Sequence, residues 1–387
     1  MSNSVQTRSY ALTGAIGEAT ALYAGRLGPN DLIVTGQNTQ ALFPTRQIKA
    51  SDVSAPVPKS LHSLEDLVIL SGDERFDIFD YLTRNSVVGL LVQKNGRTIC
   101  ERYEHGVTER TRWMSMSMAK SVSTTLAGVA VREGCIGGLD DNLADYLPVL
   151  RDSAYDGVMV RHLLQMTSGV AWNDVHTDPA SDRRHMLTLQ LQHQPGAILD
   201  YVSSRPRAAA PGTRWNYSTG ETHIVGALVK AATGAWLSDY LTEKIWTPMG
   251  AEADAAWWLE APAGLEVAGA GICATLRDYV RFCAFVMADG VIDGRRVLPE
   301  GWVAEATAPL VDAEAGRKYG FMWWPVPDAD GGYADRAFSA RGIFGQFVYV
   351  NPVKNLVIGV ISARSKPRWS EAIPDNDFFN AVAAFTS

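Results

Sequence analysis

The order of the expected strands and helices limits the fold of this sequence more than any other feature. Val87 to Lys94 is an apolar run rich in β-branched residues, Asn95-Gly96 is typical of a type I′ turn, and Thr98 to Tyr103 has the character of a returning strand. Strand character reappears far along the chain, at Phe347 to Val350 and at Leu356 to Ser362. We therefore expect an antiparallel sheet whose strands come from both ends of the chain.

Helical periodicity dominates the residues between these strands. Helices are expected within residues 112–136, 160–166, 225–232, 237–245, 276–289 and 375–385. Strands at both ends with a helical middle are typical of an α+β fold, in which helices flank an antiparallel sheet and a helical lobe is inserted.

This pattern also suggests where the lobes begin and end. We assign residues 61–136 and 271–387 to an α/β lobe, residues 137–270 to a helical lobe, and residues 1–60 to an N-terminal extension with little regular structure. The cleft between the lobes is the expected place for a site. Residues 173–210 are polar and are expected to form an excursion that covers this cleft.

Composition and charge indicate a soluble globular protein. The chain has 387 residues, of which 47% are hydrophobic and 20% charged, and its net charge is −7. A negative balance disfavours nucleic acid and anionic membranes as partners, and no run of apolar residues is long enough to predict a transmembrane helix. The N-terminus lacks the pattern of a signal peptide. The four cysteines of the chain are scattered, which indicates reduced packing residues and not a disulfide or zinc framework. We therefore expect a cytoplasmic protein.

Ser117-Met118-Ala119-Lys120 is the first candidate for chemistry. Residues three apart on a helix share a face, so the Ser117 hydroxyl and the Lys120 amine are expected to meet. Both lie near the expected start of the helix, where unpaired N–H groups favour negative charge. Such a pair can activate a serine nucleophile without a histidine. The alternative is a capped, buried helix with a surface lysine.

Tyr217 is the second candidate. It lies at the end of a loop that begins at Pro211-Gly212, ahead of a helix expected from about Glu221. A nearby lysine cation favours the phenolate form of a tyrosine, which suits it to proton transfer. The alternative is an aromatic side chain that fills the core.

In combination, Ser117, Lys120 and Tyr217-Ser218 resemble the motifs of the serine β-lactamase and penicillin-binding-protein superfamily. Within it, the chain is most similar to the family VIII carboxylesterases and the 6-aminohexanoate-dimer hydrolases. The resemblance covers about residues 85–365 and includes, in the family's order, Gly138-Leu139-Asp140-Asp141, Tyr146-Leu147-Pro148, residues 160–169, Thr275-Leu276-Arg277-Asp278 and Tyr319-Gly320-Phe321-Met322-Trp323-Trp324. It implies a β-lactamase-like fold and an acyl-enzyme on Ser117, with Lys120 and Tyr217 as the proton-transfer groups and no metal or organic cofactor.

The third motif of this family, Lys-Thr-Gly or His-x-Gly on a strand, is matched by Ala340-Arg341-Gly342. By resemblance, the backbone N–H groups of Ser117 and Ile343 would form the oxyanion hole, and Gly342 would leave room for a substrate carbonyl. Ala340 stands where the motif has a cation, and strand alternation is expected to point Arg341 to the opposite face. This departure favours an esterase over a β-lactamase.

The match to the 6-aminohexanoate-dimer hydrolases is less complete. Their substrate-binding tyrosine aligns near His176, and the aspartate that binds the amino end of their substrate falls near Leu187. Asp174, Asp178 and Asp182 lie nearby in the sequence and are alternatives for binding an amine. We interpret these three as solvated loop carboxylates.

Two further motifs have both structural and functional interpretations. Trp323 and Trp324 are candidates for the wall of an acyl pocket, with core packing as the alternative. Gly269-Ala270-Gly271 fits a nucleotide-binding glycine pattern, but no strand precedes it and no acidic partner follows, so we interpret it as close packing.

Together these features predict a serine carboxylesterase that acts on a small-molecule ester or amide. The alternatives are an amide hydrolase of the 6-aminohexanoate-oligomer or β-lactam type, and a non-catalytic binding protein with the same fold. The sequence carries no signal for an oligomeric state.

Overall fold

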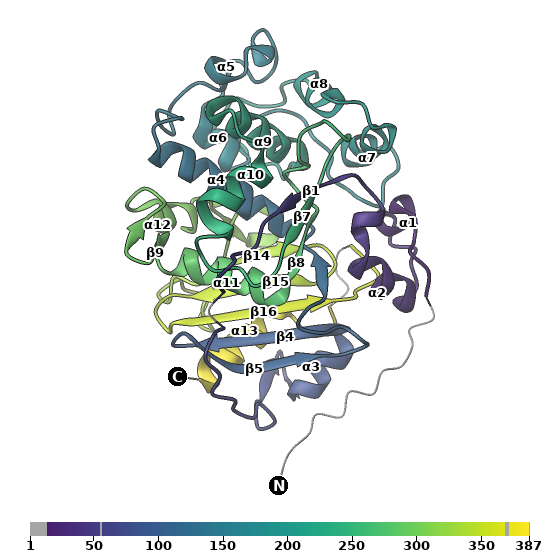
Figure 1. Ribbon diagram of the computed structural model, residues 1–387, viewed down its shortest axis with the longest axis vertical. Helices are drawn as coiled ribbons and strands as arrows, with labels where there is room; N and C mark the ends of the chain where they lie inside the picture. The colour runs from purple at the N-terminus through teal and green to yellow at the C-terminus, as the bar shows by residue number, and fades with distance from the viewer. Residues whose placement is uncertain (1–13, 55, 368–370, 387) are drawn as a thin grey trace.

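A six-stranded antiparallel sheet forms the centre of the computed structural model, which describes residues 14–54, 56–367 and 371–386 (Figure 1). The strands follow the order β13 (Trp324–Pro325), β14 (Phe338–Gly342), β15 (Gln346–Asn351), β16 (Leu356–Ser362), β4 (Val87–Lys94) and β5 (Arg97–Tyr103). β16 pairs with β4, so the sheet joins strands from both ends of the chain, as the sequence predicts. The predicted type I′ turn is also confirmed, because Asn95 and Gly96 both have the positive φ that it requires.

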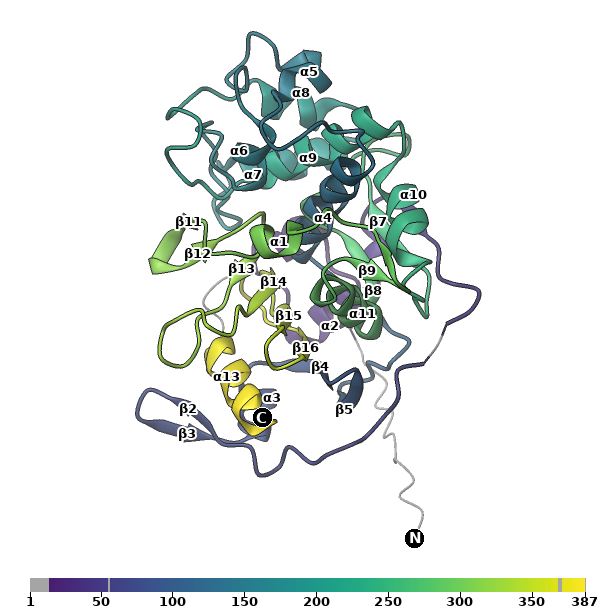
Figure 2. The same cartoon turned by 90° about the vertical axis from the view of Figure 1, so that its left-hand side faces the viewer.

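A hydrophobic core lies on each face of this sheet, and alternate residues along a strand point to one core or the other. On β15, Phe347 and Tyr349 pack towards α3 (Ile78–Arg84) and α13 (Asp375–Phe385), whereas Val348 and Val350 belong to the core on the other side. α11 (Leu276–Met287) covers that second face, and Figure 2 shows α11 and α13 on opposite sides of the sheet. Strands buried on both faces are expected to be almost continuously apolar, which explains why β4, β15 and β16 are visible in the sequence.

A second antiparallel sheet has the order β1 (Thr45–Ile48), β7 (Ala255–Trp258), β8 (Ile272–Thr275) and β6 (Arg112–Met114). Its first strand corrects the expectation of little regular structure in the N-terminal extension. Besides β1, this segment forms α1 (Ala19–Tyr23) and α2 (Pro29–Gln37); the expectation for residues 1–13 lies outside the described residues. β1 is four residues long and mostly polar, so its sequence resembles a loop, and only pairing with β7 makes it a strand. The lobe boundaries stay a prediction.

The remaining elements are helices and short strand pairs. The helices are α4 (Met118–Arg132), α5 (Leu143–Tyr146), α6 (Val160–Leu164), α7 (Asp182–Gln192), α8 (Ala197–Ser203), α9 (Thr219–Thr233), α10 (Leu237–Leu241) and α12 (Trp302–Ala306), with short helical turns at Thr39–Ala41, Pro148–Leu150, Thr242–Trp246 and Glu314–Gly316. The two-stranded pairs are β2 (Ile69–Ser71) with β3 (Glu74–Phe76), β9 (Val291–Ile292) with β10 (Arg295–Arg296), and β11 (Val311–Asp312) with β12 (Lys318–Tyr319).

Helices α5 to α9 gather at one end of the molecule, above both sheets, as Figure 1 shows. The polar excursion at residues 173–210 contains α7 and α8. None of the helices in the described part of the chain is long and apolar enough to cross a membrane.

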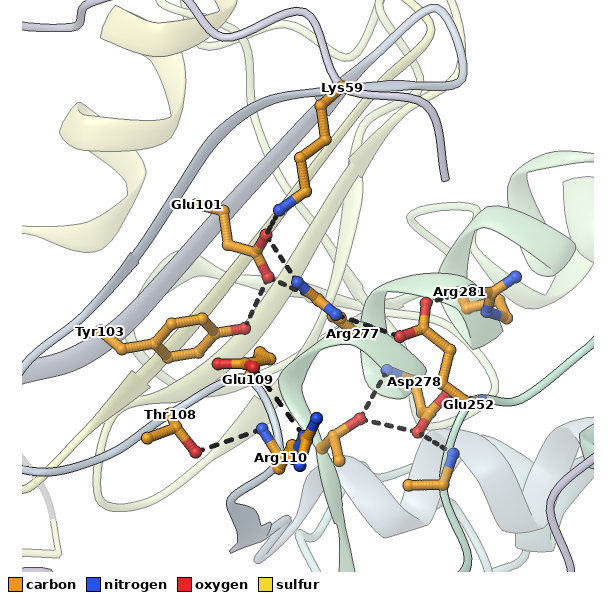
Figure 3. A network of polar contacts seen from close by, with 12 residues as sticks. Lys59, Glu101, Tyr103, Thr108, Glu109, Arg110, Glu252, Arg277, Asp278 and Arg281 are labelled. Carbon is orange, nitrogen blue, oxygen red and sulfur yellow. Dashed lines mark hydrogen bonds and ion pairs between the residues drawn. The ribbon is translucent and has the colours of Figure 1, made fainter. Parts of the chain in front are cut away.

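Glu101 of β5 is the centre of a polar network that connects four parts of the chain (Figure 3). Its carboxylate accepts hydrogen bonds from Lys59 Nζ at 2.7 Å and from Arg277 Nε of α11 at 2.6 Å. Arg277 also donates to Glu252 at 3.2 Å. Burial alone would raise the pKa of Glu101, but the hydrogen bonds and charges of Arg277 and Lys59 outweigh it and lower the pKa to about 2.

We expect Glu101→Gln to lower the free energy of unfolding at neutral pH by about 2 to 3 kcal/mol, since it removes the anion between two cations. A carboxyl group whose pKa falls from 4.5 to about 2 on folding stabilises the fold above 4.5, and this stabilisation is lost as the pH falls towards 2. The difference between wild type and variant, measured by denaturant unfolding, should therefore narrow on acidification. Glu243→Gln, at an exposed ion pair, is the control and should change little. A difference that does not depend on pH would contradict this account.

Candidate active site

Ser117 lies at the start of α4, directly after a short turn that follows β6. The turn is held against β8, because Ser115 N–H donates to the Ile272 carbonyl at 2.7 Å and Ile272 N–H donates to Ser115 Oγ at 3.1 Å. Met116 has a φ of 44°, a left-handed conformation that is unfavourable for this residue and that the bonds on its neighbour help to maintain. Ser117 is 8% exposed and lines a pocket that Tyr217 and Gly342 also line.

Lys120, one turn further along α4, points back at this serine. Its Nζ donates to Ser117 Oγ at 3.2 Å, to Thr219 Oγ1 at 3.1 Å and to the Gly269 carbonyl at 2.8 Å. The side chain is 1% exposed. Burial lowers the pKa of Lys120 to about 7; the charge of Asp174 opposes this and that of Arg183 adds to it. A sizeable fraction of Lys120 is therefore uncharged at neutral pH and can accept a proton from the serine.

Tyr217 approaches the same place from the loop before α9. Lys120 Nζ lies 5.1 Å from the centre of its ring. The ring stacks on Trp324 at 6.2 Å and meets the edge of Tyr319 at 6.3 Å, which fixes its position at the pocket wall. The structure thus brings Ser117, Lys120 and Tyr217 together, although about a hundred residues separate the first two from the third.

The pocket has an empty volume of about 750 Å³, open solvent included. Its lining combines expected residues of the site with six charged side chains, and consists of Ser117, Tyr217, Glu314, Arg317, Trp324, Arg341, Gly342, Ile343, Gly345, Phe347, Arg364, Pro367, Glu371 and Asp375. Within the described residues, no group of three or more His, Cys, Asp or Glu side chains is arranged to hold a metal ion.

Gly342 and Ile343, at the end of β14, form the pocket wall next to Ser117. A side chain at Gly342 would have its Cβ 2.6 Å from the Ser115 carbonyl and 2.5 Å from Gln346 Oε1. The glycine is therefore required by the close approach of β14 to the turn that carries Ser117, a reason that differs from the expected room for a substrate carbonyl. The oxyanion role of the Ser117 and Ile343 N–H groups stays a prediction.

Two of the predicted substrate-binding residues lie outside the pocket. Trp323 is buried in the core, where it packs edge-on against Phe338 at 5.2 Å, and the neighbouring Trp324 lines the pocket in its place. His176 is also buried and stacks on Tyr23 of α1 at 5.7 Å. The sequence did not predict α1, so it gave no indication of this partner for His176.

Arg341 follows the expected strand alternation and still lines the pocket. It points to the α13 face, where Nε donates to Ser339 Oγ at 2.7 Å and Nη2 donates to Asn376 Oδ1 at 2.6 Å. The pocket continues past the turn after β14 and so reaches this side as well, as its lining by Gly345 and Phe347 indicates.

Three residues around Lys120 were not identified as site residues from the sequence. Thr219 and the Gly269 carbonyl accept its hydrogen bonds, and a Cβ at Gly269 would lie 3.1 Å from Nζ. The interpretation of Gly269-Ala270-Gly271 as close packing is thus confirmed, with Lys120 as the packed group. Asp174 is 6% exposed, so its interpretation as a solvated carboxylate is wrong. Thr219 follows the candidate Tyr217 by two residues, so its position in the sequence could have identified it as a neighbour of the site.

Comparison with known proteins defines the class. The Beta-lactamase family model matches residues 81–377, so this chain belongs to the Beta-lactamase family, as the motifs indicate. The 6-aminohexanoate-dimer hydrolase of Paenarthrobacter ureafaciens is 25% identical over 306 residues, which cover 75% of this chain and 76% of that protein.

Solved structures confirm the β-lactamase-like α+β fold. A Bacillus anthracis protein provisionally assigned as a 6-aminohexanoate-dimer hydrolase superimposes with a TM-score of 0.81 at 22% identity, covering 92% of this chain and 94% of that one. EstCE1, a hydrolase with promiscuous acyltransferase activity, gives a TM-score of 0.58 at 17% identity over 74% of this chain and 91% of its own. At these identities the likeness concerns the fold alone.

Proposed function

We propose that this protein is a serine hydrolase that cleaves carboxylic esters of small molecules through an acyl-enzyme on Ser117. The observation that carries the proposal is the 3.2 Å contact between Lys120 Nζ and Ser117 Oγ at the wall of a pocket. Because burial lowers the pKa of Lys120 to about 7, this amine is suited to accept the hydroxyl proton near neutral pH.

The reaction has two steps. In acylation, Ser117 Oγ attacks the ester carbonyl carbon and its proton passes to the Lys120–Tyr217 pair, which returns a proton to the leaving alkoxide. In deacylation, the same pair takes a proton from water as the water attacks the carbonyl carbon of the acyl-enzyme. The bond from this carbon to Ser117 Oγ then breaks, the pair returns the proton to Ser117 Oγ, and the carboxylic acid leaves. The N–H groups of Ser117 and Ile343 stabilise the oxyanion of the tetrahedral intermediate in each step. One such donor typically lowers the barrier by about 3 kcal/mol.

Two departures from the family motifs argue against the two kinds of amide substrate considered, β-lactams and 6-aminohexanoate oligomers. Ala340 supplies no cation for the carboxylate of a β-lactam, and Leu187, where an aspartate would bind an amino end, is a buried core residue. Amide hydrolysis is the second candidate, because a relative that is 25% identical over three quarters of the chain is a 6-aminohexanoate-dimer hydrolase.

Turnover of p-nitrophenyl butyrate, the linear 6-aminohexanoate dimer and nitrocefin, together with mass spectrometry after fluorophosphonate treatment, tests the proposal. We expect a higher kcat/KM for the ester than for either amide, and a single label on Ser117. A preference for the dimer would establish the second candidate. A label on another residue, or neither label nor turnover, would contradict a serine hydrolase at this site.

A further inference from the structure

A buried carboxylate lies directly behind Lys120. Asp174 Oδ1 accepts hydrogen bonds from Thr219 N–H at 2.9 Å and from Trp172 Nε1 at 2.7 Å, and Asp174 Oδ2 accepts one from Thr219 Oγ1 at 3.2 Å. The same Thr219 hydroxyl accepts from Lys120 Nζ at 3.1 Å. A continuous line of hydrogen bonds, each donating towards the carboxylate, therefore runs from the amine beside Ser117 to Asp174.

The charged groups that act on Asp174 are cationic. Burial would raise its pKa, but the charges of His176 and Lys120, the Thr219 N–H and the charge of Arg183 outweigh burial, so the pKa of Asp174 is lowered and the group is ionised. Arg183 is itself buried, with its guanidinium 4.3 Å from the centre of the Tyr23 ring. This contact joins the start of α7 to α1.

Lys120 faces a different set of groups. Besides its three hydrogen-bond acceptors on α4, on α9 and in the loop before β8, it meets the Tyr217 ring. Two charges act on it from further away, those of Asp174 and Arg183. Of these, only the Asp174 carboxylate favours the ammonium form, since burial and Arg183 both oppose it.

We infer that Asp174 is a positioning residue for hydrolysis at Ser117: through Thr219 it holds the Lys120 amine against the serine and balances its positive charge. The inference rests on the proposed function and adds to it a control of the pH range in which the serine is reactive. Without the negative charge of the carboxylate, the Lys120–Tyr217 pair loses its proton more readily. This holds whichever of the two groups carries that proton. The acid limb of the activity profile then moves to lower pH.

The test is Asp174→Asn, which keeps a side-chain oxygen for Thr219 and Trp172 and removes the charge. The measurement is the pH dependence of the rate at which a fluorophosphonate labels Ser117, because it needs no knowledge of the substrate. In the wild type, we expect the labelling rate to fall on the acid side with a midpoint near pH 7. In the variant, this midpoint should lie about one pH unit lower, because one nearby negative charge has been removed. Asp200→Asn, the same change at an exposed position on α8, is the matched control and should leave the limb in place.

The connecting hydroxyl gives a second test, which also serves if Asp174→Asn fails to fold. Thr219→Val removes the hydroxyl at nearly constant shape and should slow labelling at every pH, whereas Thr219→Ser should restore it. Equal rates in these two variants, or a limb in folded Asp174→Asn that coincides with the wild type, would overturn the inference. Absence of any label on wild-type Ser117 would instead refute the proposed function. In that case, an NMR titration of Lys120 in wild type and Asp174→Asn still decides whether the carboxylate acts on the amine.

Discussion

Ser117→Ala is expected to reduce ester turnover by about 10⁴-fold or more, since removal of a serine nucleophile usually leaves only the contribution of binding and the oxyanion hole. The fold should be unaffected. The Ser117 hydroxyl accepts one hydrogen bond, from Lys120, and lies at the pocket wall, so the variant loses neither core volume nor a capping bond. Circular dichroism and the thermal midpoint should therefore match the wild type while kcat falls.

Ser203→Ala on α8 is the matched control, because its hydroxyl bonds to the Asp200 carbonyl of its own helix. Its activity should equal that of the wild type. If Ser117→Ala retains a rate within about ten-fold of the wild type, the nucleophile lies elsewhere and the proposed mechanism is wrong.

Lys120→Met should have the second largest effect, a loss of about 10³-fold in kcat/KM, which lies within the range that a positioned base contributes. Methionine fills a similar volume but cannot accept the Ser117 proton. The fluorophosphonate labelling rate should fall in parallel, because labelling requires the activated serine but no leaving-group alcohol and no deacylation. Lys230→Met, at a lysine that contacts the Gly234 carbonyl and the Trp236 ring, should label at the normal rate. An unchanged labelling rate in Lys120→Met would assign the activation of Ser117 to another group.

The sequence predicted those parts of the molecule that depend on neighbours along the chain. The strands at residues 87–103 and 346–362 and the last helix were recognisable because a strand buried on both faces is apolar throughout and an amphipathic helix repeats its pattern. The contact of Ser117 with Lys120 followed from helical spacing alone. Tyr217 was a candidate from its loop position and its chemistry, and the resemblance to a family motif added support.

What the sequence did not predict depends on contacts between distant segments. Burial of His176 requires Tyr23, and the burial of Asp174 requires Trp172, Thr219 and Lys120 to converge. A carboxylate in a polar loop has the same local sequence whether it is solvated or enclosed. Trp323 and Trp324 differ by one position in an extended segment, so no composition argument can tell which of them faces the pocket.

The pairing of β4 with β16 has a consequence for how activity arises during synthesis. A ribosome that has just completed α4 has already produced the nucleophile and its amine, yet the segment with Gly342 and Ile343 is more than two hundred residues from being made. Contacts between segments so distant in the chain cannot form before both segments have been made, and they are slow to form. If the proposed function holds, a nascent chain therefore carries the nucleophile before its pocket exists, and activity requires the C-terminal strands to have completed the sheet.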